Sequence, residues 1–356
     1  MNTTLPLEKA EQIAFDLRSL YRRYGYTQYK MSKFEEYDLY ASNKDFLLSE
    51  NVITFTDLSG KLMALKPDVT LSIVKNSRDD ADSLQKLYYH ENVYRVSKNS
   101  QGFREIQQVG LETLGNIDDY SILEVLQLAA KSLETISDDC ILEISHLGVM
   151  TALTEDLTAQ QKAEIFRCIG SKSAHELTAI CREAGVAEET AQLLKALASC
   201  GGAPEVVLPK VKALLGENKP LQLLEQLSSI LKNTACKLRI DFSVVDDIHY
   251  YNGVVFKGFI RGVPDAVLSG GQYDKLMRKM KRKSGAIGFA VYLDLLERLE
   301  NDGQDYDVDT VLLYDADASL TQVSTAVQTL QDKGVSVAAY RQIPEGLRYR
   351  EAIVVR

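Results

Sequence analysis

The stretch KLYYHENVYRVSKNSQGFREIQQVGLETLG, residues 86–115, predicts two long antiparallel strands joined by a polar turn. Apolar and polar side chains alternate along both arms, which is the period of a sheet with two different faces. Four long polar side chains stand in strands that otherwise have a buried composition: Arg95, Arg104, Gln108 and Glu112. A sheet does not bury such groups without partners. On spacing alone, Gln108 and Glu112 fit the solvated face of a sheet; the other interpretation is that the set lines a pocket for a polar ligand.

The composition is that of an ordinary soluble protein. The chain has 356 residues, of which 45% are hydrophobic and 26% charged, and its net charge is −9. The negative charge argues against a nucleic-acid-binding protein that works through a broad basic surface. We expect no signal peptide and no membrane span, because neither pattern occurs. Five widely spaced cysteines and four histidines show no ligand spacing, so we expect reduced thiols, no metal site and a cytoplasmic location.

Periodicity predicts the elements on both sides of the opening stretch. Before it we expect a helix over 6–24 and a short helix after an extended segment. A hairpin should begin at Asn51, turn at 57–60 and be closed by Lys66–Thr70, with a helix from about Thr70. After it we expect a helix over 120–136 and a strand over 140–146.

The remaining sequence divides into three parts. From about 148 to 233 the pattern is helical, with one doubtful strand signal at Val206–Leu208, and we interpret this part as an inserted helical domain. Strands resume over 237–260 and 263–271, followed by a helix over 272–281 and a segment that begins as a strand and ends as a helix. Residues 306–356 predict a small β-α-β piece, so we expect a core of residues 1–305 and a C-terminal domain of residues 306–356.

Five stretches in this order resemble histidyl-tRNA synthetase, a class II aminoacyl-tRNA synthetase, over residues 6–300. They are YGY at 24–26, FTDLSGKLMALKPDVT at 55–70, the opening stretch as motif 2 with the following strand, DFSVVDDIHYYNGVVF at 241–256, and SGGQYDKL with GAIGFA at 269–290 as motif 3. The resemblance implies an α+β fold: an antiparallel sheet flanked by helices, with a helical insertion and a small C-terminal α/β piece.

Departures from the synthetase pattern fall on the residues that the family uses for ATP. Arg95 of motif 2 is present, but the position of the motif's glutamate is Ser97. The motif 3 arginine is replaced by Leu295, with Arg298 three residues late, and the arginine of the histidine signature is replaced by Asp246. Adenylate formation brings several anionic groups together and needs cationic groups to position them. We therefore expect no adenylate formation, no catalytic residue and no cofactor.

Most residues that match the histidine-binding residues of the synthetase are present in this chain. Gln108 and Glu112 match the residues that hold the amino group and the imidazole of histidine, and Asp68 replaces a glutamate. We expect one of Tyr250 and Tyr251 to lie in the core, because neighbours in a strand point to opposite faces. The expected histidine-binding set is Asp68, Thr70, Arg95, Gln108, Glu112, Tyr250 and Tyr251.

This combination resembles the regulatory subunits of ATP phosphoribosyltransferase, which are paralogues of the synthetase. The resemblance implies a non-catalytic subunit for the first step of histidine biosynthesis. Its partners would be a short-form catalytic subunit and a second copy of itself, in a hetero-octamer, with histidine as the feedback effector. The piece after residue 305 is about half the length of the synthetase's anticodon-binding domain, so tRNA is not expected as a partner.

Two other functions stay open, and so do two alternative roles for single segments. One is a divergent histidyl-tRNA synthetase, and another is a paralogue that modifies something other than tRNA. The basic run KMKRK at 279–283 fits a solvated loop better than a phosphate or RNA patch, given the acidic whole. His249 fits a structural role better than that of a catalytic base, because no acid partner is evident in the sequence.

Overall fold

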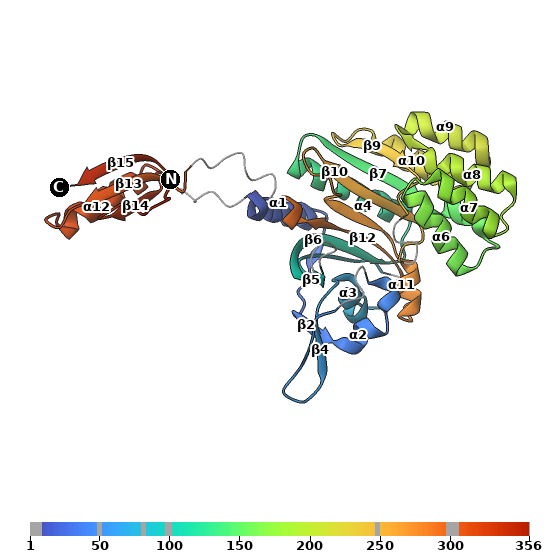
Figure 1. Cartoon of the computed structure of the whole chain (residues 1–356), viewed down its shortest axis with the longest axis horizontal. Coiled ribbons are helices and arrows are strands. Elements are labelled where there is room, and N and C mark those ends of the chain that lie inside the picture. Colours follow the sequence, from blue (N-terminus) through green and yellow to red (C-terminus); the bar gives the residue numbers. More distant parts are fainter. Residues whose placement is uncertain are drawn as a thin grey trace. The chain divides into compact units, whose positions relative to one another are not determined.

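The computed structural model describes residues 9–47, 52–79, 83–96, 102–245, 250–296 and 306–355. The chain divides into two compact units, a larger one over Lys9–Glu297 and a smaller one within Arg298–Arg356 (Figure 1). The expected domain boundary at residue 305 falls outside the described residues and stays a prediction.

A nine-stranded sheet forms the centre of the larger unit, in the order β1-β5-β6-β12-β11-β10-β7-β9-β8. The pairs β1–β5 and β7–β9 are parallel, and the other neighbours are antiparallel. The strands are β1 (Thr27–Gln28), β5 (Gln85–Val96), β6 (Phe103–Gly115), β7 (Cys140–His146), β8 (Gly201–Gly202), β9 (Lys237–Asp241), β10 (Val254–Ile260), β11 (Leu268–Gln272) and β12 (Gly285–Tyr292). The two long strands predicted from the opening stretch are β5 and β6, paired in register from Gln85↔Leu114 to Val96↔Phe103.

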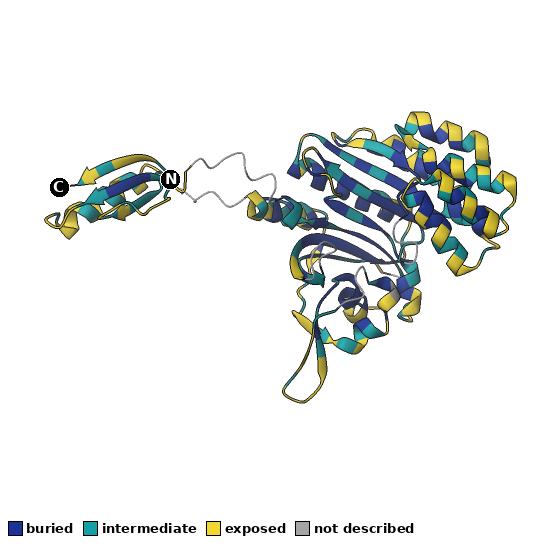
Figure 2. Cartoon of the chain, viewed as in Figure 1, coloured by how far each residue is buried: buried dark blue, intermediate teal, exposed yellow. Residues whose placement is uncertain are grey.

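Helices α1 (Lys9–Arg23) and α4 (Asp119–Ile136) cover one face of this sheet (Figure 1). The Asp118 carboxylate begins α4 by accepting a hydrogen bond from the Ser121 N–H at 2.8 Å. The apolar side of α4 is fully buried, and Figure 2 shows the buried residues concentrated in the sheet and in this helix. Between the two helices, the hydroxyls of Tyr21 and Ser132 lie 3.0 Å apart. One hydrophobic core therefore lies between the sheet and these helices. A second cluster of buried residues, which includes Leu71, Ile73, Tyr89 and Met277, forms a separate core.

The segment between β7 and β9 is almost entirely helical. It contains α5 (Leu147–Thr151), the short helical turn Ala152–Thr154, α6 (Ala159–Gly170), α7 (Ala174–Glu183), α8 (Glu188–Ser199), α9 (Pro204–Leu215) and α10 (Lys219–Leu231). Val206–Leu208, the doubtful strand signal, lies inside α9, where Pro204 occupies the first turn. The two-residue β8 is the one strand among the described residues of this segment.

A smaller sheet has the strand order β2-β4-β3. In the chain it directly precedes Asp68 and Thr70. Its strands are β2 (Phe34–Glu36), β3 (Thr54–Thr56) and β4 (Leu62–Leu65), accompanied by α2 (Tyr37–Ala41), the turn Lys44–Phe46, α3 (Thr70–Asn76) and α11 (Asp274–Lys279). The predicted hairpin is confirmed as β3–β4. The Asp57 carboxylate accepts hydrogen bonds from the N–H groups of Ser59 and Lys61 at 2.8 Å, and Gly60 adopts φ +85°.

Over residues 306–355, the smaller unit has a three-stranded parallel sheet, in the order β14-β13-β15, and one helix. The elements are β13 (Val308–Tyr314), α12 (Leu320–Gln331), β14 (Val337–Tyr340) and β15 (Tyr349–Val355). Ser319 and Gln322 form a capping box at the start of α12. Val311 and Leu312 of the central strand are fully buried. The unit thus has the predicted β-α-β order, and the apolar run at its end is a third strand.

Candidate functional site

The open face of the central sheet carries a pocket of about 900 Å³. Strand alternation places Arg104, Gln108 and Glu112 of β6 on the same face, and all three line the pocket. The opposite face carries Leu111 and its cross-strand partner Phe289, whose ring lies 5.9 Å from that of Tyr21 on α1. The two faces inferred from the opening stretch are therefore a pocket face and a helix-covered face. Gln108 and Glu112 are only 3% and 2% exposed, so the solvated-face interpretation is wrong.

Glycines form the floor of the pocket. Gly288 lies opposite Glu112 on the neighbouring strand, and Gly271 lies opposite Gly288. A Cβ at Gly288 would collide with the Glu112 carboxylate, and a Cβ at Gly271 would lie 2.8 Å from the ring of Tyr251. The side chains around the floor fit together only because these positions lack one.

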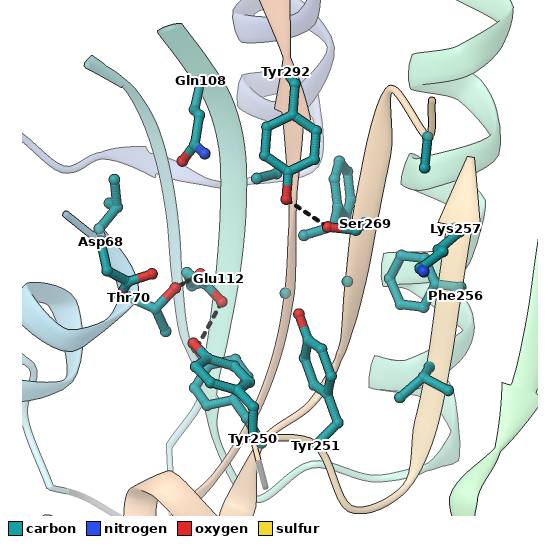
Figure 3. A pocket seen from close by; sticks show the side chains of 18 of the residues that line it. Asp68, Thr70, Gln108, Glu112, Tyr250, Tyr251, Phe256, Lys257, Ser269 and Tyr292 are labelled. Carbon is teal, nitrogen blue, oxygen red and sulfur yellow. Dashed lines mark hydrogen bonds between the residues drawn. The ribbon is translucent and has the colours of Figure 1, made fainter. Parts of the chain in front are cut away.

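Glu112 lies at the deep end of the pocket and accepts two hydrogen bonds. Thr70 Oγ1 donates to its Oε1 at 2.8 Å (Figure 3). The Tyr273 hydroxyl donates to its Oε2 at 2.6 Å. Burial raises the pKa of Glu112 to about 8, although both hydrogen bonds act in the opposite direction. The site therefore holds a carboxyl group that changes its charge close to neutral pH.

Asp68 supplies a second acid beside Thr70. Its Oδ1 accepts a hydrogen bond from the Leu71 N–H at 2.8 Å, which fixes the carboxylate at the start of α3. Burial raises the pKa of Asp68, and the Arg95 guanidinium, with Nη2 4.0 Å from Oδ2, opposes that rise. Arg95 Nε also donates to the Pro67 carbonyl at 2.8 Å. Arg95 is therefore held against the loop that carries Asp68.

An aromatic wall closes one side of the pocket. The rings of Tyr250 and Tyr251 lie 4.8 Å apart, and that of Tyr250 lies 5.6 Å from Tyr273. Both neighbours line the pocket, so the expectation that they point to opposite faces is wrong. The reason is that β10 begins only at Val254, so strand alternation does not apply to the two tyrosines (Figure 3).

The structure brings all seven expected histidine-binding residues to one pocket: Asp68, Thr70, Arg95, Gln108, Glu112, Tyr250 and Tyr251. Their binding of histidine stays a prediction. Ser97, Asp246, His249 and Arg298 lie outside the described residues. Leu295, where motif 3 should carry its arginine, is described and partly buried.

Several residues of the site were not found from the sequence. Tyr273 donates to Glu112, and its place in motif 3 was the available signal. Lys257, Ser269 and Tyr292 line the pocket opposite Asp68 and Thr70 (Figure 3). Lys66 is 1% exposed and forms an ion pair with Glu91, beneath the loop that carries Asp68. Nothing in the sequence pattern distinguished Lys66 from a surface lysine.

The basic run at 279–283 contacts neighbouring segments of the chain. Arg282 Nη2 donates to the Lys75 carbonyl at 2.7 Å, and the Lys283 N–H donates to the Asp79 carboxylate at 2.9 Å. The Lys279 ammonium lies 5.1 Å from the centre of the Phe46 ring. These contacts give the run a structural role at the edge of the α3 region.

All five cysteines are free thiols. In the described parts of the chain, no cluster of three or more histidine, cysteine or acidic side chains is placed to hold a metal ion. Within the same ranges, no helix combines the length and apolar character needed to cross a bilayer.

Comparisons with known proteins agree with this architecture. The family model for histidyl-tRNA synthetase matches residues 5–296. The ATP phosphoribosyltransferase regulatory subunit of Clostridium kluyveri is 29% identical over 361 residues, which cover 97% of this chain and 92% of the relative. A solved ATP phosphoribosyltransferase regulatory subunit/histidyl-tRNA synthetase from Bacillus halodurans has a TM-score of 0.78 at 23% identity, covering 99% of this chain and 95% of that one.

An ATP phosphoribosyl transferase complex from Thermotoga maritima contains a chain with a TM-score of 0.63 at 20% identity, covering 80% of this chain and 97% of that one. At these identities the two solved structures show the shared fold. The family model covers most of this chain's length, and the chain therefore belongs to the histidyl-tRNA synthetase family.

Proposed function

We propose that this chain is a non-catalytic regulatory subunit of ATP phosphoribosyltransferase, which acts at the first step of histidine biosynthesis. The observation that carries the proposal is the match to a named regulatory subunit over 97% of this chain and 92% of that relative. The match includes most of the C-terminal part of this chain. The substitutions at Leu295 and Asp246 support the same assignment, because the positions that should hold ATP lack their arginines.

Histidine is the effector that the pocket chemistry favours. Its amino group fits between Asp68, Thr70 and Gln108, which offer a carboxylate and two neutral oxygen acceptors. Its imidazole fits between Glu112 and Tyr251, where a carboxyl group and a hydroxyl can meet the ring nitrogens (Figure 3). Arg95 lies beside Asp68 and balances its charge. The pocket thus offers groups of the right kind for a polar amino acid with a heteroaromatic side chain.

The regulatory mechanism is a population shift. Histidine in the pocket favours one arrangement of this subunit, and the catalytic partner responds to that arrangement. Such coupling is reciprocal and typically amounts to about 1–3 kcal/mol. The assembly would contain short-form catalytic subunits and dimers of this chain in a cytoplasmic hetero-octamer, without tRNA.

A divergent histidyl-tRNA synthetase is the second candidate, favoured by the family model itself. That activity requires cationic groups for a triphosphate. Asp246 reverses the charge at one such position, and Leu295 removes it at another. Histidine-dependent exchange of pyrophosphate into ATP by the purified chain would establish the synthetase and refute the regulatory role.

The deciding experiment combines the chain with a short-form ATP phosphoribosyltransferase. We expect the two proteins to co-purify, the activity of the catalytic subunit to rise, and histidine to inhibit the complex. A complex made with Glu112→Gln should keep its activity and lose sensitivity to histidine. Absence of a complex, or of any gain in activity, would refute the proposed function.

A further inference from the structure

Tyr292 ends the glycine floor of the pocket. On β12 the residues of the pocket face become larger in the order Gly288, Ala290, Tyr292, and all three line the pocket. Gly288 pairs with Glu112, the acid at the deep end. Tyr292 pairs with Gln108, four residues away along each strand, which is roughly 14 Å at about 3.4 Å per residue. The floor therefore has no side chain opposite Glu112 and an aromatic ring opposite Gln108.

The ring of Tyr292 leans back over this floor. Its hydroxyl oxygen lies 2.6 Å from Ser269 Oγ. Ser269 is the cross-strand partner of Ala290, two residues before Tyr292, so this contact joins diagonal neighbours of the sheet. Diagonal neighbours lie about 7–8 Å apart, a distance that a tyrosine side chain can span. Figure 3 shows the ring of Tyr292 between Gln108 and Ser269, with its hydroxyl directed at Ser269.

The pocket is large enough for more than one amino acid. Its volume of about 900 Å³ lies within the range of sites that hold drug-sized ligands. Selection of a small ligand must therefore come from the shape of the floor. Along β12, Tyr292 is the first large side chain that the floor presents after Gly288 and Ala290.

A ligand bound as proposed above would direct its carboxyl group toward Tyr292. Its amino group and imidazole would occupy the side that carries Asp68 and Glu112. A carboxylate would be repelled by that of Asp68 and would turn away from this side, along the floor past Ala290. There it would meet the hydroxyls of Ser269 and Tyr292, which can donate hydrogen bonds. Any group attached to the carboxyl carbon would then continue into the tyrosine ring.

We propose that Tyr292, held by Ser269, restricts the pocket to a free amino acid and excludes ligands whose carboxyl group carries a bulky substituent. This inference rests on the proposed histidine-binding function and takes it further, because it assigns the residue that limits the size of the ligand. Tyr292 also opposes an aminoacyl adenylate, in which a nucleotide is joined to the carboxyl group. The pocket thus disfavours an adenylate by its shape, in addition to lacking the arginines replaced by Leu295 and Asp246.

The test compares two amides that differ only in the group expected to be excluded. L-histidinamide and N-benzyl-L-histidinamide share the imidazole, the amino group and the amide carbonyl, and only the second extends beyond them. Calorimetric titration of the full chain gives both dissociation constants, with L-histidine as the reference ligand. In the original chain the benzyl amide should bind at least about tenfold more weakly than histidinamide, because its added group is forced against a packed side chain. Tyr292→Ala should raise the affinity for the benzyl amide at least about tenfold and bring the two constants within about threefold of each other.

Three further variants make the outcome specific. Tyr292→Phe keeps the ring and should still exclude the benzyl amide. Tyr120→Ala removes an exposed tyrosine of α4 and should bind all three ligands as the original chain does. Thermal melting checks that each variant folds. Tyr292→Val, with a side chain well suited to strands, replaces Tyr292→Ala if that variant unfolds.

Other results overturn the inference. An original chain that binds both amides equally would show that no barrier exists, and no gain of benzyl-amide affinity in Tyr292→Ala or Tyr292→Val would show that Tyr292 is not the barrier. If the original chain binds L-histidine but neither amide, the inference stands only if one of these two variants gains measurable binding of the benzyl amide. Failure of the original chain to bind L-histidine would refute the proposed histidine-binding function as well, whereas the other results leave that function standing.

Discussion

The buried carboxyl group of Glu112 lies in the pocket and also makes the stability of the fold depend on pH. Burial raises its pKa to about 8 from an ordinary value of 4.5. Below about pH 4.5 the carboxyl group is protonated in the folded and unfolded chain alike. Between about pH 4.5 and 8 the unfolded chain loses this proton while the folded chain keeps it, so the contribution of Glu112 to stability falls as pH rises. The contribution of Glu112 to the stability of the empty chain is therefore largest at acid pH, below about 4.5.

Glu112→Gln removes this ionisation and keeps the size of the side chain. We expect the free energy of unfolding of the variant, relative to the original chain, to rise between pH 5 and pH 8.5. Each unit of pKa shift corresponds to about 1.4 kcal/mol, so the change should reach several kcal/mol. Urea denaturation without ligand at a series of pH values measures it. Glu189→Gln, exposed on α8, is the control, and parallel curves for the Glu112 variant and the original chain would contradict the prediction.

At the scale of single elements, the sequence predicted secondary structure best where a periodic pattern continued over many residues. The alternation in 86–115 predicted β5 and β6, and the apolar side of 120–136 predicted α4. The stretch 237–260 was expected to hold strands throughout, yet no described residue between β9 and β10 is in a strand. Tyr250 and Tyr251 consequently lie together on the aromatic wall. Local alternation does not determine where a strand stops when tertiary packing holds the following turn.

The buried Lys66 shows a second limit of sequence reasoning. Lysine is almost never fully buried without a partner, and its partner here, Glu91, is 25 residues away on β5. The backbone of Lys66 forms two further hydrogen bonds. Its carbonyl accepts from the Tyr94 N–H at 2.9 Å, and its N–H donates to the Lys33 carbonyl at 3.1 Å. The pair therefore ties the segment leading into α3 to the central sheet, and no periodic pattern marks such a contact.

Lys66→Met should be strongly destabilising, because it leaves the Glu91 carboxylate in a mostly buried site without its cation. We expect a loss of about 3 kcal/mol, toward the lower end for breaking a buried pair because Glu91 keeps some exposure. The double variant Lys66→Met with Glu91→Leu should regain much of that loss. Urea denaturation measures both, with Lys61→Met at the exposed Lys61–Glu36 pair as a control that changes stability little. Equal effects of the two single lysine variants would contradict the prediction.

At the scale of the whole molecule, the chain contains two units with separate cores. The pocket belongs to the larger unit, since all its lining residues lie between Leu47 and Tyr292. In its described residues the smaller unit has a parallel sheet of three strands with one helix, a small core for an independent fold. The sequence predicted the order of these elements, but it could not predict that α12 would have no buried residue among those described.

Thermal unfolding should accordingly show two transitions, and L-histidine should raise only the one that belongs to the larger unit. A ligand at a hundred times its dissociation constant stabilises the state that binds it by about 2.7 kcal/mol. Leu312→Ala, in the buried centre of β13, should lower only the other transition, because removing a buried leucine side chain typically costs about 2–5 kcal/mol. Scanning calorimetry of the original chain and of the Leu312→Ala variant, each with and without L-histidine, measures the transition temperatures. A single transition that responds to the ligand and to Leu312→Ala alike would show instead that the two units unfold together, and that the C-terminal piece contributes to the stability of the pocket.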